Sequence, residues 1–342
     1  MAASSTDQST HPVRVLITGG AGFIGSHLVD AHRAKGDEVV VIDDCSTGQA
    51  QNLMAHQDQI TLHRCDLSEG LSTLRSSQDT RFDLIYHLAA AVGVDLVLED
   101  PIGSIRTNVL QTDALLEFAR EFGSPPTFIA SSSEVYGRPG ASVFSEEDDS
   151  IFGPTSVTRW SYAHAKAIDE HLALAYAQQH QLPVVVGRFF NTVGPRQIGR
   201  YGMVLPRFVS AALENQPIRV FGDGKQSRCF CDVRDVVTVL PKLLANPDAY
   251  GRVMNIGSDR AISILELAEL VKTVVGSDSA IQRVEYSEAY PAGFEDLRHR
   301  KPDLSRLRSL VEFEYSYSLE ETIADLAEQI KNGAPHQSGV SG

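Results

Sequence analysis

The chain has 342 residues, 42% of them hydrophobic and 22% charged, and its formal net charge at pH 7 is −14. This length suffices for two domains or for one large α/β unit. The acidic balance argues against a nucleic-acid partner or an anionic membrane surface, and no apolar run reaches the ~18 residues of a membrane-spanning helix.

Residues 1–12 are polar and predict a disordered tail, without the basic start or the apolar stretch of a signal peptide. Residues 332–342 predict a second loose tail. Four cysteines lie between these ends, at positions Cys45, Cys65, Cys229 and Cys231. No further ligands stand near them at metal-site spacing, so we expect no metal and reduced thiols in a cytoplasmic protein.

A glycine-rich turn follows the first predicted strand. Residues 13–18, VRVLIT, form a β-branched run typical of a buried parallel strand, and Gly19, Gly22 and Gly25 follow ahead of an amphipathic helical pattern. Glycines let the backbone turn tightly and approach a pyrophosphate, whose charge suits a helix N-terminus. A plain βαβ turn is the alternative to such a dinucleotide site.

A carboxylate at the end of the second predicted strand favours the dinucleotide interpretation. The strand EVVVID ends at Asp43, where a carboxylate accepts hydrogen bonds from the adenosine ribose hydroxyls. The same carboxylate would repel a 2′-phosphate, so the pattern predicts NAD rather than NADP. In the alternative turn, Asp43 would be a solvated strand end.

Predicted strands and helices then alternate along the chain. Asp66 stands at the end of the next predicted strand. The runs at 126–137 and 182–194 predict later strands, and helical stretches separate them. Such alternation predicts an α/β fold with a doubly wound parallel sheet, whose ligands lie at the carboxyl ends of the strands. Ser132 and Glu134, in the stretch SSSEVYG, therefore belong at the mouth of the cofactor site.

A helix predicted over residues 159–180 carries Tyr162 and Lys166, which are four apart and share one face. Tyrosine is a poor base at its usual pKa of ~10. A neighbouring ammonium and a positive nicotinamide ring would lower that pKa, so that Tyr162 removes a hydroxyl proton while a hydride leaves to NAD. This spacing is common on exposed helices, but the glycine turn and the serine strand end upstream favour catalysis.

Together these motifs resemble the extended short-chain dehydrogenase/reductases that act as nucleotide-sugar epimerases, dehydratases and decarboxylases. The resemblance covers roughly residues 13–330 and rests on TGGAGFIGSHL, Asp43, SSSEVYG, Tyr162 with Lys166, RFFNTVGPR and VFGDGKQSRCFCDVRDV. It implies a Rossmann-type NAD-binding domain, expected over 13–194 plus 232–257, and a smaller α/β nucleotide-sugar domain, expected over 195–231 plus 258–331. It implies NAD contacts at Gly19, Gly22, Phe23, Ile24, Gly25, Asp43, Asp66, Leu67, Tyr162 and Lys166.

The resemblance also gives position 134 a deciding role. In this family Ser132 hydrogen-bonds the substrate O4, and all members oxidise the sugar before their reactions diverge. Epimerases usually carry a small residue at position 134, whereas 4,6-dehydratases carry an Asp-Glu pair at 133–134. Decarboxylases that act on UDP-glucuronate carry Ser-Glu, which this chain has as Ser133 and Glu134.

Arginines support the same reaction. The stretch RWSY resembles the Arg-Trp-x-Tyr of the aminoarabinose-pathway decarboxylase domain and of plant apiose/xylose synthases, so Arg159 is expected to bind a uronate carboxylate. A surface arginine at a helix start is the alternative, although a cation there opposes the helix dipole. The resemblance further implies UDP contacts by Arg219 and Arg228, a diphosphate contact by Asn191, and Arg300 as a substrate contact and the candidate acid that protonates C5. Gathered in one cleft, these arginines would reverse the local potential of an acidic protein.

The sequence therefore predicts an NAD-dependent enzyme that forms a 4-keto intermediate and decarboxylates UDP-glucuronate to UDP-xylose or a UDP-4-keto-pentose. A UDP-hexose or UDP-glucuronate 4-epimerase is the alternative, followed by a 4,6-dehydratase and by a non-catalytic dinucleotide sensor. We expect a cytoplasmic homodimer without nucleic-acid or membrane partners. The stretch at 89–101 and Phe294 depart from the decarboxylase pattern and leave the sugar open.

Overall fold

The computed structural model describes residues 12–77, 81–91, 99–138, 140–199, 203–285 and 298–333. The predicted tails lie almost wholly outside these residues. Phe294 and most of the stretch at 89–101 lie outside them as well.

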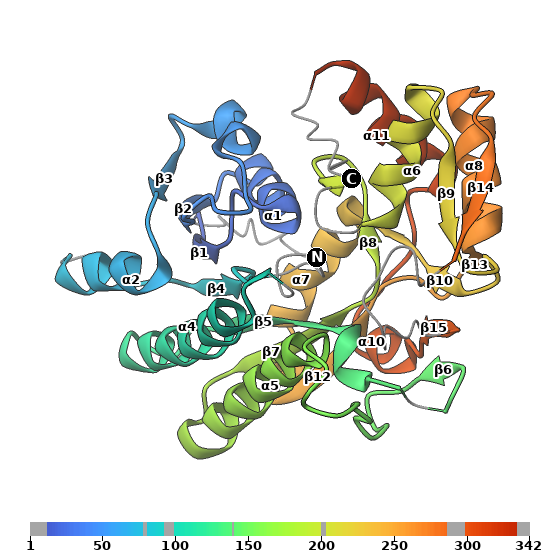
Figure 1. The fold of residues 1–342 in the computed structure, drawn as a ribbon. Helices are drawn as coiled ribbons and strands as arrows, with labels where there is room; N and C mark the ends of the chain where they lie inside the picture. Colours follow the sequence, from blue (N-terminus) through green and yellow to red (C-terminus); the bar gives the residue numbers. More distant parts are fainter. Residues whose placement is uncertain are drawn as a thin grey trace, which may run out of the picture.

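Seven strands form a parallel sheet in the order β12-β7-β5-β4-β1-β2-β3 (Figure 1). Their bounds are β1 Arg14–Thr18, β2 Glu38–Ile42, β3 Ile60–His63, β4 Leu84–His87, β5 Thr127–Ser132, β7 Val184–Phe189 and β12 Arg252–Ile256. The strand order reverses between β1 and β4, which is where a doubly wound sheet opens a crevice for ligands at the carboxyl ends. The predicted Rossmann-type fold is confirmed.

Helices cover both faces of this sheet because its strands are apolar on both sides. In β1, Val15 and Ile17 pack on the face covered by α1 and α7, while Leu16 packs on the face of α2, α4 and α5 (Figure 1). These helices are α1 Phe23–Ala34, α2 Leu67–Ser76, α4 Pro101–Glu121, α5 Trp160–His180 and α7 Val233–Leu244, with a 3-10 turn η1 at Ala50–His56 and another, η4, at Pro247–Ala249. Continuous β-branched runs are typical of strands buried on both faces.

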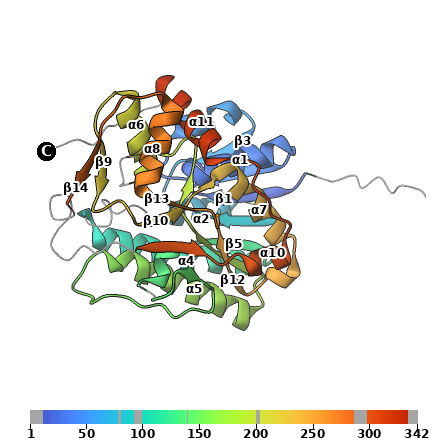
Figure 2. The same ribbon diagram turned by 90° about the vertical axis from the view of Figure 1, so that its right-hand side faces the viewer.

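The second unit gathers short strands and helices from the later part of the chain. Figure 2 shows α6, α8 and α11 grouped beside β9 and β14, and their apolar side chains form a separate core. The helices of this core are α6 Val204–Leu213, α8 Ile264–Val275 and α11 Leu319–Lys331, whereas α10 Ser305–Leu310 packs on β12 in the core of the large sheet. The strands are β6 Val143–Phe144, β10 Ser227–Cys229, β13 Ala261–Ser263 and β15 His299–Pro302 in one sheet, with the pairs β8 Thr192–Val193 with β11 Cys231–Asp232 and β9 Ile218–Phe221 with β14 Ile281–Val284.

The chain crosses between the two units more than once. Helix α7 and strand β12 return to the large sheet after β8–β11, whereas β6, from the first half of the chain, pairs with β15. The domain boundaries drawn from the sequence remain a prediction. Among the described helices, none is both long and apolar enough to cross a membrane.

Candidate active site

The turn between β1 and α1 is shaped so that glycine is required. Gly19 has φ +73°, and a Cβ there would lie 2.6 Å from the Ala89 nitrogen; a Cβ on Gly25 would lie 2.1 Å from the Gly19 oxygen. Gly22 caps α1 without a side-chain hydrogen bond, and no acidic residue stands in the first turn of the helix. The amides of the first helical turn therefore face no carboxylate of their own helix, which suits a pyrophosphate, while Asp43 accepts from the Ala21 and Gly22 amides just before that turn.

Asp43 ties this turn to the end of β2. The carboxylate is buried, and it accepts hydrogen bonds from the backbone nitrogens of Ala21 and Cys45, each at 2.8 Å. Burial raises the pKa of Asp43, although the two amides oppose that shift. Each carboxylate oxygen keeps a further lone pair for a ribose hydroxyl.

Asp66 and Leu67 have structural roles in the described part of the chain. Asp66 is the N-cap of α2 and accepts a hydrogen bond from the Glu69 nitrogen at 3.0 Å, while Leu67 is buried in the core beneath the helix. Their contacts with NAD remain predictions.

Ser132 and Tyr162 meet at the carboxyl end of β5, and Lys166 lies one helical turn beyond Tyr162. Ser132 ends the strand, accepts a hydrogen bond from the Glu134 nitrogen at 3.2 Å and contacts the Tyr162 hydroxyl. Lys166 is buried, and its ammonium donates to Asp169 Oδ2 at 3.0 Å. The helix α5 thus presents Tyr162 and Lys166 from one face, as predicted.

The pKa of Tyr162 is set by its buried surroundings and by nearby carboxylates. Burial raises this pKa, Glu134 and Asp169 raise it further, and the hydrogen bond with Ser132 opposes them. The Lys166 ammonium is paired with Asp169 at 3.0 Å, and the lowering expected from Lys166 together with a positive nicotinamide ring remains a prediction. Sequence reasoning missed Asp169. Its position three residues after Lys166 on the same helix could have indicated an ion pair between the two side chains.

Glu134 is surrounded by guanidinium groups from separate segments. It lies in the 3-10 turn η2, Ser133–Tyr136, and its Oε1 accepts from Arg300 Nη1 at 2.6 Å, while Arg159 Nη2 stands 3.7 Å from Oε2. Burial would raise the pKa of Glu134, but Arg300, Arg159 and Arg228 together hold it below its usual value. The carboxylate is therefore charged at neutral pH.

Arg228 and Arg300 form one buried pair across adjacent strands. They face each other in the parallel register of β10 and β15, and each is 8% exposed. Arg228 donates to the Ser227 carbonyl at 2.8 Å, and Arg300 Nε has no hydrogen-bond partner within the described residues. Two buried guanidinium groups on one rung form a strongly positive spot that suits an anion.

The other two predicted substrate contacts lie further from Glu134. Asn191 follows β7, has φ +30°, and donates from Nδ2 to the Cys229 carbonyl at 3.4 Å, so it is fixed beside the strand that carries Arg228. Arg219 is exposed on β9 and stands 6.0 Å from the Phe221 ring. No contact among the described residues joins Arg219 to the Glu134 cluster.

A buried polar network of Arg188, Glu170, Ser131 and Tyr136 lies next to the site at the end of β5. Sequence reasoning missed this network. Arg188 on β7 donates to both oxygens of Glu170, at 2.9 and 2.7 Å, and Glu170 also accepts from Ser131 at 2.5 Å. The Arg188 guanidinium lies 4.6 Å from the Tyr136 ring, whose hydroxyl donates to Asn255 at 2.6 Å. The sequence did carry a signal for this network, because Arg188 stands in the apolar strand pattern that ends in RFFN. A guanidinium buried in a strand needs a buried partner of opposite charge.

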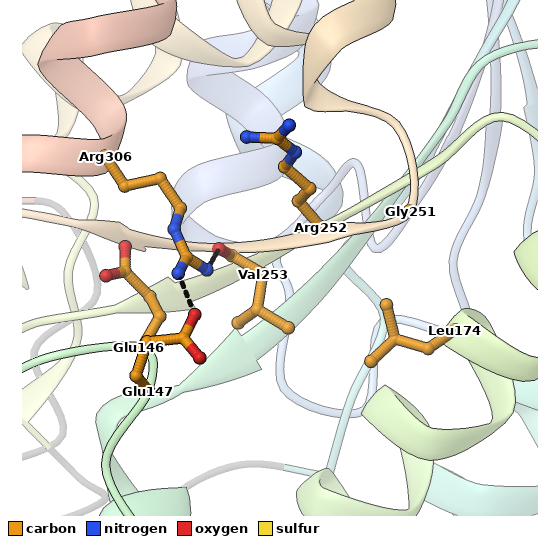
Figure 3. Close-up of a pocket in the computed structure, with 7 residues that line it drawn as sticks. All are labelled: Glu146, Glu147, Leu174, Gly251, Arg252, Val253 and Arg306. Atoms are coloured by element: carbon orange, nitrogen blue, oxygen red, sulfur yellow. Dashed lines mark hydrogen bonds and ion pairs between the residues drawn. The ribbon is translucent and has the colours of Figure 1, made fainter.

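A cavity of about 410 Å³ lies at the free edge of β12, away from these residues. Figure 3 shows Arg306 pointing to Glu147 and to the Val253 carbonyl, with Arg252 and Leu174 at the rim. Arg306 donates to the Val253 carbonyl of β12, the edge strand of the large sheet. Without such a side chain, this backbone group of the edge would have no partner in the sheet. This cavity shares no lining residue with the candidate active site.

Comparisons with known proteins agree with this geometry. The sequence profile described as "Epimerase: NAD dependent epimerase/dehydratase family" matches residues 15–257. The chain is 38% identical over 315 residues to the UDP-N-acetyl-alpha-D-glucosaminuronate decarboxylase of Bacillus cytotoxicus, covering 91% of this chain and 96% of that one. It is 34% identical over 324 residues to UDP-glucuronic acid decarboxylase 1 of Arabidopsis thaliana, covering 94% and 70%.

Solved structures give the same picture of the fold. The UDP-glucose 4-epimerase of Thermotoga maritima, solved with UDP-glucose, superposes with a TM-score of 0.83 at 27% identity and covers 93% of this chain and 99% of its own. The UDP-N-acetylglucosamine 4-epimerase of Methanobrevibacter ruminantium, solved with UDP-N-acetylmuramic acid, has a TM-score of 0.84 at 26% identity, covering 95% and 100%.

Proposed function

The chain belongs to the NAD dependent epimerase/dehydratase family, and within it we propose an NAD-dependent decarboxylase of a UDP-linked uronic acid. The observation that carries this proposal is Glu134, a charged carboxylate held beside Ser132 and Tyr162 by Arg159 and Arg300. Relatives named as decarboxylases of two UDP-uronates support it. UDP-glucuronate is the first substrate to test.

The residues of the first unit fit NAD. Gly19, Gly22 and Gly25 would let the pyrophosphate approach the backbone at the start of α1, where a Cβ on Gly19 or Gly25 would collide with other backbone atoms. Asp43 would accept hydrogen bonds from the adenosine ribose and disfavour NADP. The chemistry that NAD supplies when bound is removal of a hydride from sugar carbon 4.

The chain's own groups would handle the protons and the charges. Tyr162 would take the proton from the O4 hydroxyl, and Ser132, already in contact with Tyr162, would hold the same oxygen. A ketone at carbon 4 stands β to the C6 carboxylate, so the C5–C6 bond breaks with release of carbon dioxide, and the resulting enolate takes a proton from water at carbon 5. Arg159 would hold the C6 carboxylate. The negative charge of Glu134 would repel the substrate carboxylate and so destabilise the bound uronate before the C5–C6 bond breaks.

We propose a changed role for Arg300. The sequence suggested it as the acid at carbon 5, but a guanidinium keeps its protons at any working pH. Its 2.6 Å contact with Glu134 and its register with Arg228 support a role in orienting Glu134 and in binding the anionic substrate.

Product analysis tests the proposed function directly. The purified protein with NAD is incubated with UDP-glucuronate and, separately, with UDP-N-acetylglucosaminuronate, since the names of the relatives differ by this N-acetyl group. Mass spectrometry should show, from at least one of them, either a UDP-pentose lighter by one carbon dioxide or its 4-keto form, which is lighter by one carbon dioxide and two hydrogens, with NADH released. An unchanged mass with a new chromatographic position would indicate a 4-epimerase instead.

We also propose that the protein is a cytoplasmic homodimer that pairs through α4 and α5. Exposed apolar side chains lie on these packed helices, at Ile102, Ile105 and Leu110 of α4 and Ile168 of α5. A second copy of the chain would cover them. Sedimentation should give a dimer that Ile105→Glu converts to a monomer; a monomeric wild type would contradict this assembly.

A further inference from the structure

A buried ion pair lies one turn beyond Tyr162 on α5. Lys166 Nζ stands 3.0 Å from Asp169 Oδ2, and the two residues are 2% and 0% exposed. Asp169 Oδ1 makes no hydrogen bond within the described part of the chain. A buried carboxylate in this position is stable in its charged form mainly because the ammonium faces it.

The groups around the pair leave Asp169 as the counter-charge of Lys166. His87 on β4 lies between Thr18 at 2.8 Å and Thr112 at 3.2 Å, and burial, followed by the Lys166 charge, lowers its pKa to about 3. His87 is therefore neutral at working pH. Burial raises the pKa of Asp169, while Lys166 and the Thr112 hydroxyl oppose the shift.

The remaining acidic neighbour is occupied elsewhere. Glu170, adjacent to Asp169 on the same helix, accepts two hydrogen bonds from Arg188 and one from Ser131. Tyr162 in turn faces Glu134 from η2 and Asp169 from its own helix, with the Ser132 hydroxyl beside it. Asp169 therefore faces Tyr162 on one side and the Lys166 ammonium, one helical turn beyond Tyr162, on the other.

We propose that Asp169 is a positioning residue that neutralises the Lys166 ammonium and thereby sets how readily the Tyr162 phenol gives up its proton. The inference rests on the proposed role of Tyr162 as the base of sugar oxidation. With Asp169 charged, the ammonium is anchored but its effect on the phenol is offset. Without that charge, the ammonium would stabilise the phenolate.

Two readouts in the Asp169→Asn variant test the proposal. The first is the ultraviolet phenolate signal of Tyr162, obtained as the difference between each protein and its Tyr162→Phe counterpart without any substrate. We expect its midpoint to fall by about one pH unit or more. The second is the pH–rate profile of the NAD-loaded enzyme with UDP-glucuronate, whose acidic limb should shift in the same direction. The exposed Asp248→Asn removes the same charge in the 3-10 turn η4 and should shift neither.

Asp169→Asn leaves the Lys166 ammonium buried without a partner, and this variant could fail to fold for that reason. A double variant keeps the test valid in that case. Lys166→Met combined with Asp169→Asn removes both charges, and its phenolate midpoint should stay within about half a pH unit of the wild type. An unchanged midpoint in folded Asp169→Asn, or a rise in the double variant, would overturn the proposal. The phenolate readout needs no turnover, so a failure of the proposed reaction would be seen separately, as activity that survives Tyr162→Phe.

Discussion

The Arg159 guanidinium lies over the Trp160 ring at 5.3 Å and stands 3.7 Å from Glu134. Its side chain makes no capping hydrogen bond at the start of α5, and it is 13% exposed. The alternative of a surface arginine at a helix start is therefore not what the structure shows. A cation held against an aromatic face near Tyr162, the proposed base, suits a substrate carboxylate.

Arg159→Ala should weaken UDP-glucuronate binding by about 10- to 100-fold, the loss expected for a charge-assisted hydrogen bond of ~1.5–3 kcal/mol. UDP-glucose, which lacks the carboxylate, should be affected far less. Calorimetry on the NAD-loaded protein measures both affinities. Arg138→Ala is the matched control, because Arg138 lies over the same Trp160 ring at 5.5 Å. Equal weakening of both sugars by Arg159→Ala would make this arginine structural or a diphosphate ligand.

Tyr162→Phe should lower turnover by ~10²- to 10⁴-fold, because only the phenolic oxygen that moves the proton is lost. The ring still packs on α5, so NAD affinity and the unfolding midpoint should stay close to those of the wild type. Product formation under saturating substrate measures the loss. A variant that keeps more than half of its turnover would show that another group is the base.

At the scale of elements, the end of β2 and the glycine turn are held together through one carboxylate. Asp43 accepts the backbone amides of Ala21 in the turn and Cys45 beyond the strand. The shape of the turn therefore depends on Asp43, the group that we propose also sets the cofactor preference.

Asp43→Ala should reduce the affinity for NAD more than the affinity for NADP, so the gap between the two cofactors narrows. The reason is that the variant loses both the ribose acceptor and the charge that repels a 2′-phosphate. Calorimetric titration with each dinucleotide measures the gap. Equal affinities of the wild type for NAD and NADP would contradict this account of Asp43.

The network beneath the site joins four elements through one ion pair. Arg188 of β7 and Glu170 of α5 are 7% and 6% exposed, and they link the catalytic strand at Ser131 to Tyr136 of η2. Breaking a buried pair leaves an uncompensated charge, which is more costly than losing the pair as a whole.

Arg188→Met should lower the free energy of unfolding by roughly 3–5 kcal/mol, because Glu170 stays buried without its partner. Urea denaturation measures the change. The control is Arg75→Met, which removes a half-exposed pair with Glu121 and should cost no more than about 1 kcal/mol. Similar losses in the two variants would mean that the network contributes little to the fold.

For the whole molecule, the large parallel sheet could be predicted from the sequence. The partners of the buried charged side chains could not. Continuous β-branched runs and the glycine turn identify the Rossmann-type sheet, because strands buried on both faces need such residues. The pairing of Glu170 with Arg188 and the register of Arg228 with Arg300 join residues from different elements, which no local pattern reveals. The resemblance to a family supplied Arg159, Arg228 and Arg300, while Asp169 came from the structure alone.

The charge distribution of the whole molecule explains how an acidic chain could hold an anionic sugar nucleotide. The net charge is −14, yet Arg159, Arg228 and Arg300 converge on one carboxylate from the α5 start and two strands of the second unit. A local excess of positive charge attracts an anion even where the total charge is negative.

Release of carbon dioxide from UDP-glucuronate labelled at C6 tests the central claim most directly, with wild type and Glu134→Gln compared in the presence of NAD. The account predicts labelled carbon dioxide from the wild type and a loss by orders of magnitude in Glu134→Gln, while some oxidation at C4 persists because Tyr162 and Lys166 remain. Absence of labelled carbon dioxide from the wild type, with UDP-galacturonate formed instead, would contradict the account and make the protein a 4-epimerase.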